Sequence, residues 1–303
     1  MAAQLKPLNE QVIVITGASS GIGLATAQAA AAKGAAVVLA ARSRDALQKI
    51  ASEINDKGGQ ALAVECDVSE REQVERVAGE AVAGFGRIDT WVNDAGLGMY
   101  GRLDETTEED ARRLFDINFW GVVNGSLAAL SHLKKQGGAL INVGSEVSDA
   151  VVPLIGMYAA SKHAVKGFTD GLRIEIEEID KAPVSITLIQ PTAVDTPFPQ
   201  HARNYMPQEP QLPMEPIDPQ KVAEAILDAA EHPTRVKKVG VMAVMNTAMW
   251  NYTPAIAEKV AAGFAEKQKR SDAPRNPDGA LYEPSEIAGP VGTTHGTVGR
   301  EKK

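Results

Sequence analysis

Short apolar runs alternate with longer segments that carry apolar residues at helical spacing. The longer segments include residues 44–56 and 70–83. Strands that alternate with helices pair in parallel, and helices then cover both faces of the sheet. The alternation therefore predicts a doubly wound parallel α/β sheet flanked by helices. The predicted strands are residues 12–15, 37–40, 61–64, 88–92, 140–143 and 184–189.

Four further segments complete this plan. Residues 107–136 and 157–179 are predicted as long helices, and Thr107 is a suitable N-cap for the first of them. Residues 219–231 are predicted as a helix and residues 236–244 as a seventh strand. The fold class is therefore a Rossmann-type α/β sheet of about seven parallel strands, whose ligands bind beyond the carboxyl ends of the strands.

Two regions fall outside the alternation. Residues 197–217 contain six prolines, which exclude a regular helix or a central strand, so we expect a lid over the substrate. The chain is expected to form one catalytic domain over residues 1–250 and a carboxyl-terminal extension over residues 251–303. A short helix should begin at Pro254 and a loose tail at Ser271.

Two contacts are expected from the extension. Met245, Met249 and Trp250 should help to close the substrate end of the cavity. Leu281-Tyr282 is the one anchor expected in the tail, as a short contact on the protein surface. Deletion of residues 286–303 should therefore change neither the melting temperature nor turnover appreciably.

Composition excludes several classes of protein. A net charge of −8 argues against a nucleic-acid-binding role, which needs a basic face. Cys66 is the only cysteine, so neither an intrachain disulfide nor a cysteine metal cluster can form. The five histidines have no metal-ligand spacing. We expect no membrane span and a cytoplasmic location, because no apolar run approaches about 20 residues and the start lacks a secretory core.

A glycine-rich loop separates the first strand from the first helix. A pyrophosphate needs backbone N–H groups at a helix N-terminus and glycines that let the chain approach closely. A tight turn without a ligand can have a similar sequence. The spacing Gly-x-x-x-Gly-x-Gly resembles that of the short-chain dehydrogenase/reductase family, and the resemblance assigns cofactor contacts to Gly17, Ser19, Ser20, Gly21, Ile22 and Gly23.

The end of the second strand bears on the choice of cofactor. Ala41 stands where family members that prefer NAD carry an aspartate, and Arg42 follows it. A guanidinium binds a 2′-phosphate through charge-assisted hydrogen bonds, so NADPH/NADP⁺ is the expected cofactor. Arg42 could instead be a solvated surface residue.

Three further motifs follow in the order that the family has them. Asp67-Val68 resembles the pair that touches the adenine ring. Residues 93–96 resemble Asn-Asn-Ala-Gly, which steadies the sheet and flanks the cofactor, although an aspartate replaces the second asparagine. Residues 191–196 resemble Pro-Gly-x-Val-x-Thr, with Thr192 in place of glycine. The cofactor contacts that these motifs imply are Asp67, Val68, Asn93, Ala95, Gly96, Pro191, Val194 and Thr196.

Tyr158 and Lys162 lie four residues apart at the start of a predicted helix, so they share one face. An ammonium lowers the pKa of a nearby phenol from about 10, which suits a reversible acid and base. Ser145 and Asn118 precede them in the order of the family's catalytic tetrad. The resemblance implies that Tyr158 is the acid/base and that Ser145 orients and polarises the carbonyl oxygen of the substrate. It further implies that Lys162 binds the nicotinamide ribose and lowers the pKa of Tyr158, and that Asn118 holds a water that links Lys162 to solvent.

The combined motifs indicate an NADPH-dependent oxidoreductase that reduces a carbonyl to an alcohol, or the reverse. A non-catalytic NADP-binding regulator or scaffold and an epimerase of the same fold are the alternatives. Family members are commonly homodimers or homotetramers joined through the two long helices. The residues expected near the substrate form a mostly apolar set that suits a medium-sized hydrophobic ketone. They are Leu97, Met99, Tyr100, Val147, Val151, Leu154 and the lid.

Overall fold

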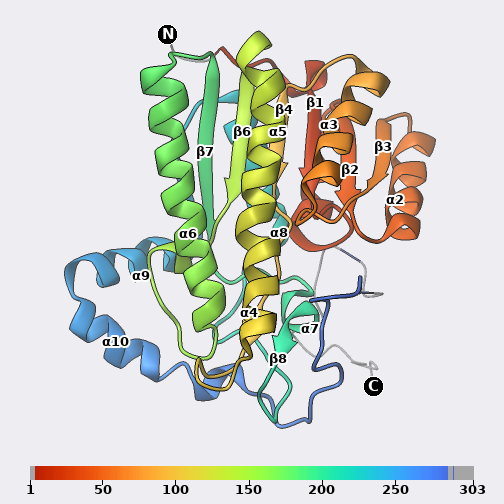
Figure 1. The fold of residues 1–303 in the computed structure, drawn as a ribbon. Helices are drawn as coiled ribbons and strands as arrows, with labels where there is room; N and C mark the ends of the chain where they lie inside the picture. The colour runs from red at the N-terminus through yellow and green to blue at the C-terminus, as the bar shows by residue number, and fades with distance from the viewer. Residues whose placement is uncertain (1–3, 286–288, 290–303) are drawn as a thin grey trace, which may run out of the picture.

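The computed structural model describes residues 4–285 and residue 289. All seven strands of its central sheet run parallel, in the order β3-β2-β1-β4-β6-β7-β9 (Figure 1). The strand order reverses between β1 and β4, which places the topological switch there. The predicted fold is therefore confirmed. The strands are β1 (Val12–Thr16), β2 (Ala36–Ala41), β3 (Gln60–Glu65), β4 (Thr90–Asn93), β6 (Gly138–Val143), β7 (Val184–Pro191) and β9 (Val236–Val239).

Helices cover both faces of the sheet. Alternate residues of β1 point to opposite sides, so that Val12 and Val14 join one hydrophobic core while Ile13 and Ile15 join another. Figure 1 shows α5 and α6 side by side in front of the sheet. The first core contains residues of α3 (Arg71–Phe85), α4 (Glu108–Phe115), α5 (Gly121–Gln136) and α6 (Gly156–Arg173), and the second contains residues of α1 (Gly21–Ala32), α2 (Arg44–Asp56) and α8 (Pro219–Glu231).

Both predicted long helices contain a π-helical segment. Asp116–Trp120 joins α4 to α5, and Ile174–Ile179 continues α6. The expected cap is confirmed, because the side chain of Thr107 accepts a hydrogen bond from the amide of Asp110. A π-helical turn is a frequent feature of functional sites. Here it contains Asn118.

The predicted strand over residues 236–244 is wrong in its second half. β9 ends at Val239, Gly240 adopts a φ of +97°, and helix α9 (Val241–Tyr252) begins at once. A short apolar run does not distinguish a strand from a helix, and this run was assigned to the wrong element. The helix expected from Pro254 is α10 (Pro254–Ala262). Since α9 continues past residue 250, the expected domain boundary falls inside a helix.

The proline-rich region 197–217 is mostly irregular, as predicted. It contains only the short helix α7 (Phe198–His201) and the two-residue strand β8 (Arg203–Asn204), which pairs with β5 (Met99–Tyr100). The anchor expected at Leu281-Tyr282 is present, but it is deeper than the expected surface contact, because Ala280 and Leu281 are buried in the first core. Apart from Gly289, the predicted deletion of residues 286–303 concerns residues outside those described.

Candidate active site

A cavity of about 300 Å³ lies beyond the carboxyl ends of the strands. Its walls come from the loops after β1, β2, β3, β4, β6 and β7, and it reaches from Arg42 to Tyr158. This is the end of the sheet at which a ligand was expected. The predicted site residues that line it are Gly17, Ser19, Ser20, Gly21, Ile22, Arg42, Asp67, Val68, Ala95, Gly96, Ser145, Tyr158, Lys162, Pro191, Val194 and Thr196.

Two residues assigned to cofactor contacts lie behind the cavity wall instead. A Cβ atom on Gly23 would lie 2.4 Å from the carbonyl oxygen of Gly17, so this glycine permits the close packing of the loop on α1. The buried amide of Asn93 donates to Asn142 at 2.8 Å and to Ser126 at 3.2 Å. Asn93 therefore ties β4 to β6 and α5, which agrees with the sheet-steadying part of its expected role.

The glycine-rich loop has a fixed shape. Gly17 and Gly21 adopt φ values of +73° and +54°, a region that favours glycine. The hydroxyl of Thr16 accepts hydrogen bonds from the amides of Asp94 and Ala95, at 3.2 and 3.3 Å. These contacts hold the start of the glycine-rich loop against the loop that follows β4. The glycine-rich loop leads to the N-terminus of α1, whose amides suit an anion.

Tyr158 and Lys162 lie on α6 beside the loop that follows β6. The Ser145 hydroxyl lies near the phenol of Tyr158 in the cavity lining and acts to lower the pKa of that phenol. The Lys162 ammonium lies 5.8 Å from the centroid of the Tyr158 ring and donates to the carbonyl oxygen of Val143 at 2.9 Å. Both hydroxyls and the ammonium therefore meet at one end of the cavity.

Asn118 lies under this group, outside the cavity lining. Its amide donates to the carbonyl oxygen of Leu97 at 2.9 Å and to the Ser161 hydroxyl at 3.0 Å, and its oxygen accepts from the Leu97 amide at 2.8 Å. A Cβ atom on Gly96 would lie 3.3 Å from the Asn118 oxygen and 3.5 Å from the Lys162 nitrogen. The side chains of Asn118 and Lys162 therefore both lie next to Gly96.

The pKa of Tyr158 is raised, which is opposite to the expected lowering. Burial is the main cause, Asp94 and Glu146 add to it, and only the hydrogen bond with Ser145 acts in the other direction. Burial also lowers the pKa of Lys162 to about 8, although Asp94 holds it up. The carboxyl of Asp94 is itself buried, which raises its pKa to about 7, while Lys162 and the Gly23 amide lower it.

Glu146, Phe198 and Gln268 also line the cavity but were not singled out in the sequence. The ring of Phe198 meets that of Tyr158 edge-on, with centroids 5.1 Å apart. The buried carboxylate of Glu146 accepts a hydrogen bond from Asn246 of α9 at 2.9 Å. Glu146 directly follows Ser145, which could have drawn attention to it, whereas no sequence signal marks Gln268.

The substrate-side expectations are met only in part. Leu97, Tyr100 and Val147 line the cavity, whereas Met99, Val151 and Leu154 do not. The expected closure of the cavity by α9 side chains is wrong. Among the described residues that line the cavity none is Met245, Met249 or Trp250, and Met245 is 57% exposed.

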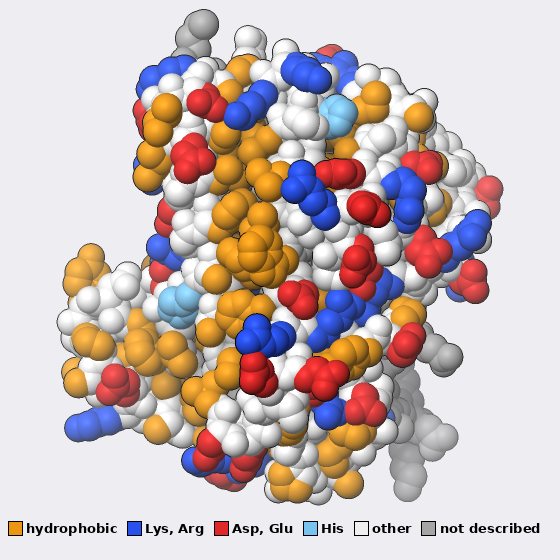
Figure 2. All heavy atoms as spheres, viewed as in Figure 1, with side chains coloured by type: hydrophobic (Ala, Val, Ile, Leu, Met, Phe, Trp, Pro, Cys, Tyr) orange, Lys and Arg blue, Asp and Glu red, His pale blue; other side chains and the backbone are white. Residues whose placement is uncertain are grey.

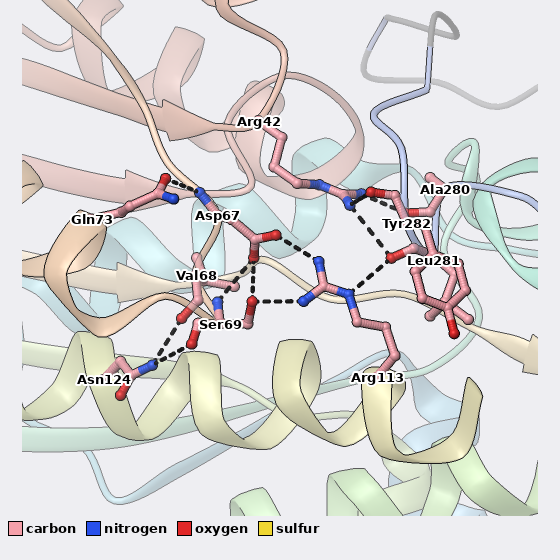
Figure 3. A network of polar contacts seen from close by, with 10 residues as sticks. All are labelled: Arg42, Asp67, Val68, Ser69, Gln73, Arg113, Asn124, Ala280, Leu281 and Tyr282. Atoms are coloured by element: carbon pink, nitrogen blue, oxygen red, sulfur yellow. Dashed lines mark hydrogen bonds and ion pairs between the residues drawn. The ribbon is translucent and has the colours of Figure 1, made fainter. Parts of the chain in front are cut away.

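The far end of the cavity contains Arg42 and Asp67 (Figure 3). Asp67 accepts hydrogen bonds from Arg113 of α4 and from Ser69, at 2.6 and 2.7 Å. Their combined effect exceeds that of burial and lowers the pKa of Asp67. Arg42 donates to the carbonyl oxygens of residues 280–282.

The donors at the two ends suit a long ligand that carries phosphate groups. Helix N-terminal amides face the middle of the cavity, and a guanidinium lies at the end opposite Tyr158. Within residues 4–285 and 289 no group of acidic, histidine or cysteine side chains could hold a metal ion. In the same part of the chain no helix is long and apolar enough to cross a membrane.

Comparison with known proteins identifies similar chains. The family model described as short chain dehydrogenase matches residues 11–206. YxnA of Bacillus subtilis, described as an uncharacterized oxidoreductase, is 44% identical over 285 residues, which cover 92% of this chain and 80% of the relative.

Two solved structures are also similar. An alcohol dehydrogenase of Thermococcus sibiricus, complexed with 5-hydroxy-NADP, is 34% identical, with a TM-score of 0.66 over 76% of this chain and 94% of that one. A short-chain dehydrogenase/reductase of Burkholderia phymatum in complex with NAD is 25% identical. Its TM-score is 0.74, over 83% of this chain and 96% of that one.

Proposed function

The chain belongs to the short-chain dehydrogenase family of oxidoreductases, and on this premise we propose that it interconverts a carbonyl and an alcohol with NADPH/NADP⁺. The observation that carries the proposal is that Tyr158, Ser145 and the buried Lys162 line one end of the cavity that also holds the glycine-rich loop, with the Lys162 nitrogen 5.8 Å from the centroid of the Tyr158 ring. A bound nicotinamide would supply or accept the hydride.

Each side chain has a distinct role in this proposal. Tyr158 gives its proton to the oxygen of the substrate during reduction and takes it back during oxidation. Ser145 donates a hydrogen bond to the same oxygen and so favours the negative charge that develops there. Lys162 binds the ribose next to the nicotinamide and provides a positive charge near the phenol. Asn118, through its hydrogen bonds to Leu97 and Ser161, keeps the loop and the helix beside Lys162 in place.

A preference for NADPH over NADH is proposed from the end of β2. Ala41 provides no carboxylate that would repel a 2′-phosphate, and the Arg42 guanidinium lines the cavity. Arginine has five N–H donors. Three hydrogen bonds of Arg42 go to the carbonyl oxygens of residues 280–282, so other donors are left for a phosphate. The similar structures include one complex with an NADP derivative and one with NAD, so they are compatible with either cofactor.

We propose a medium-sized apolar ketone or aldehyde, or the matching alcohol, as the substrate. Side chains around Tyr158 are mostly apolar, as the pocket of such a substrate requires. They are Leu97, Tyr100, Val147, Val152, Ile155, Phe198 and Leu212. A regulator would not need the complete set of Ser145, Tyr158 and Lys162, and an epimerase would leave the cofactor unchanged overall.

The proposal is tested by a screen of NADPH consumption over diverse ketones, aldehydes and quinones. NADPH oxidation that depends on one class of carbonyl, with formation of the alcohol, is the expected result. Cofactor binding without turnover of any carbonyl, and without oxidation of any alcohol by NADP⁺, would favour the regulator instead.

We further propose a homodimer or homotetramer of single-domain subunits in the cytoplasm. Figure 2 shows hydrophobic side chains gathered over α5 and toward α6. Trp120, Leu127 and Ile174 are 51%, 45% and 54% exposed, which suits an interface between subunits. Light scattering at micromolar concentration should give a multiple of 32.1 kDa, and a monomer would contradict the proposal.

A further inference from the structure

The carboxyl-terminal residues 276–285, here called the strap, cross the end of the cavity that holds Arg42. Ala280, Pro284 and Ser285 line this cavity together with Arg42 and Asp67. Figure 3 shows the main chain of residues 280–282 lying directly against the Arg42 and Arg113 side chains. The strap is therefore part of the cavity wall where an adenosine phosphate would bind.

Main-chain carbonyl oxygens of the strap accept the hydrogen bonds of Arg42. The Nη1 atom donates to Tyr282 at 3.1 Å and to Leu281 at 3.4 Å, and the Nη2 atom donates to Ala280. Phosphate oxygens would use the same donors with stronger, charge-assisted bonds. Three neutral oxygens thus occupy the guanidinium that we assign to the 2′-phosphate.

A second donor for phosphate is occupied in the same way. The amide of Gly21, at the N-terminus of α1, donates to the carbonyl oxygen of Gly289 at 2.9 Å. Ser20 and Gly289 also form an isolated parallel bridge. Backbone amides at a helix N-terminus are the groups that bind pyrophosphate. Carbonyl oxygens of the strap therefore accept from Arg42, and that of Gly289 accepts from the Gly21 amide. Both are donors that the same dinucleotide would use.

The strap is held by contacts outside the cofactor loop. Leu281 is fully buried in the core that also contains Leu114 of α4. The Tyr282 hydroxyl donates to Asp110 at 2.7 Å, and the Ala280 amide donates to the carbonyl oxygen of His201 at 2.8 Å.

Two of the anchoring side chains are accessible to solvent. Arg203 forms an ion pair with Asp278, whose side chain is 81% exposed, and Tyr282 is 46% exposed. The exposed ion pair contributes little, so the strap is held mainly by Leu281 and by the hydrogen bond of Tyr282 to Asp110. These contacts are few compared with those of the sheet, and the strap can therefore be released without unfolding the sheet.

We propose that the strap is an internal competitor of the cofactor: its carbonyl oxygens take the places of phosphate oxygens, and it leaves when the dinucleotide binds. This inference rests on the proposed function. The apparent affinity for the cofactor is the intrinsic affinity multiplied by the fraction of molecules in which the strap has left the site. NADPH should be affected more than NADH, because only NADPH carries the phosphate assigned to Arg42.

Hydrogen–deuterium exchange of the full chain, with and without saturating NADPH, tests the displacement. Amides of the strap should exchange faster with NADPH, while those of residues 17–23 exchange more slowly. Slower or unchanged exchange in the strap, together with protection of residues 17–23, would overturn the inference and leave the proposed function intact. Absence of protection at residues 17–23 would instead contradict cofactor binding, and the inference with it.

The double variant Asp278→Ala/Tyr282→Phe weakens the anchors without touching the cavity. Asp110 still accepts hydrogen bonds from Arg203 and Tyr205, so no buried charge loses all its partners. Titration by cofactor fluorescence should give a dissociation constant for NADPH lower by about three- to tenfold, and a smaller change for NADH. Asp272→Ala, at a 54% exposed carboxylate paired with Arg270, is the matched control and should leave both constants unchanged. Equal or weaker NADPH binding by the double variant would overturn the inference.

Discussion

The two ends of the cavity are built in different ways. At the catalytic end, Tyr158, Ser145 and Lys162 find their partners on neighbouring strand ends and on one helix. At the adenosine end, the donors of Arg42 are taken by residues about 240 positions further along the chain. One end presents a complete set of reactive groups, whereas the other presents groups that the protein's own main chain already uses.

This difference separates two kinds of requirement. Acid–base chemistry needs hydroxyls and an ammonium held at fixed positions, and burial against neighbouring elements provides this. Binding of a charged dinucleotide needs donors that exchange one partner for another, and neutral carbonyl oxygens give way to phosphate more readily than a carboxylate would. Side-chain changes at the catalytic end should therefore alter the rate of turnover, and side-chain changes at the adenosine end should alter the affinity for the cofactor.

The largest effect is expected at the catalytic end. Tyr158→Phe removes the proton donor and should reduce turnover by about 10²- to 10⁴-fold, while NADPH binding persists. Tyr100→Phe is the matched control, because Tyr100 lines the same cavity, and it should retain most of the activity. Near wild-type turnover by Tyr158→Phe would remove this residue from the chemistry.

A smaller effect, on affinity alone, is expected at the adenosine end. Arg42→Ala should weaken NADPH binding by about 1.5–3 kcal/mol, the range for a hydrogen bond to a charged group. NADH affinity should stay equal or rise slightly, because the strap loses the same partner. Arg44→Ala, at an exposed position two residues away, serves as the control in the fluorescence titration. Equal loss for both cofactors would show that Arg42 does not read the 2′-phosphate.

The smallest expected effect connects Asp94 to the pH dependence of the catalytic end. Asp94 holds up the pKa of Lys162, which is about 8, so Asp94→Asn should lower this pKa. If the charged lysine supports turnover, activity is lost as pH rises through its pKa, and the alkaline limb should move to lower pH by about one unit.

Glu146→Gln is the control for Asp94→Asn. Its carboxyl raises the pKa of Tyr158 but is not among the groups that act on Lys162, so this alkaline limb should stay in place. An unchanged pH profile in Asp94→Asn would break the proposed link between Asp94 and Lys162.

The sequence predicted those features of the molecule that depend on residues close to one another in the chain. Short apolar runs located the seven strands, although the last was predicted too long, and the spacing of Tyr158 and Lys162 placed both on one face of α6. The error at residues 241–244 arose because a short apolar run has no period of its own. The anchor at Leu281-Tyr282 was predicted from its side chains, but the contacts of the strap with Arg42 could not be, since they are made by backbone carbonyls, which every sequence has. Composition rich in proline and glycine described residues 271–285 correctly as irregular, but it does not report burial such as that of Leu281.

Direct transfer of hydrogen from the cofactor to the substrate carbon is the central claim. It is tested most directly with NADPH that carries deuterium at C4 of the nicotinamide, on the face that is transferred, and with a carbonyl identified in the screen. The account predicts one deuterium on the carbinol carbon of the alcohol product, as seen by mass spectrometry, in water of natural isotopic composition. Alcohol formed without deuterium from either C4-labelled face of NADPH would contradict it.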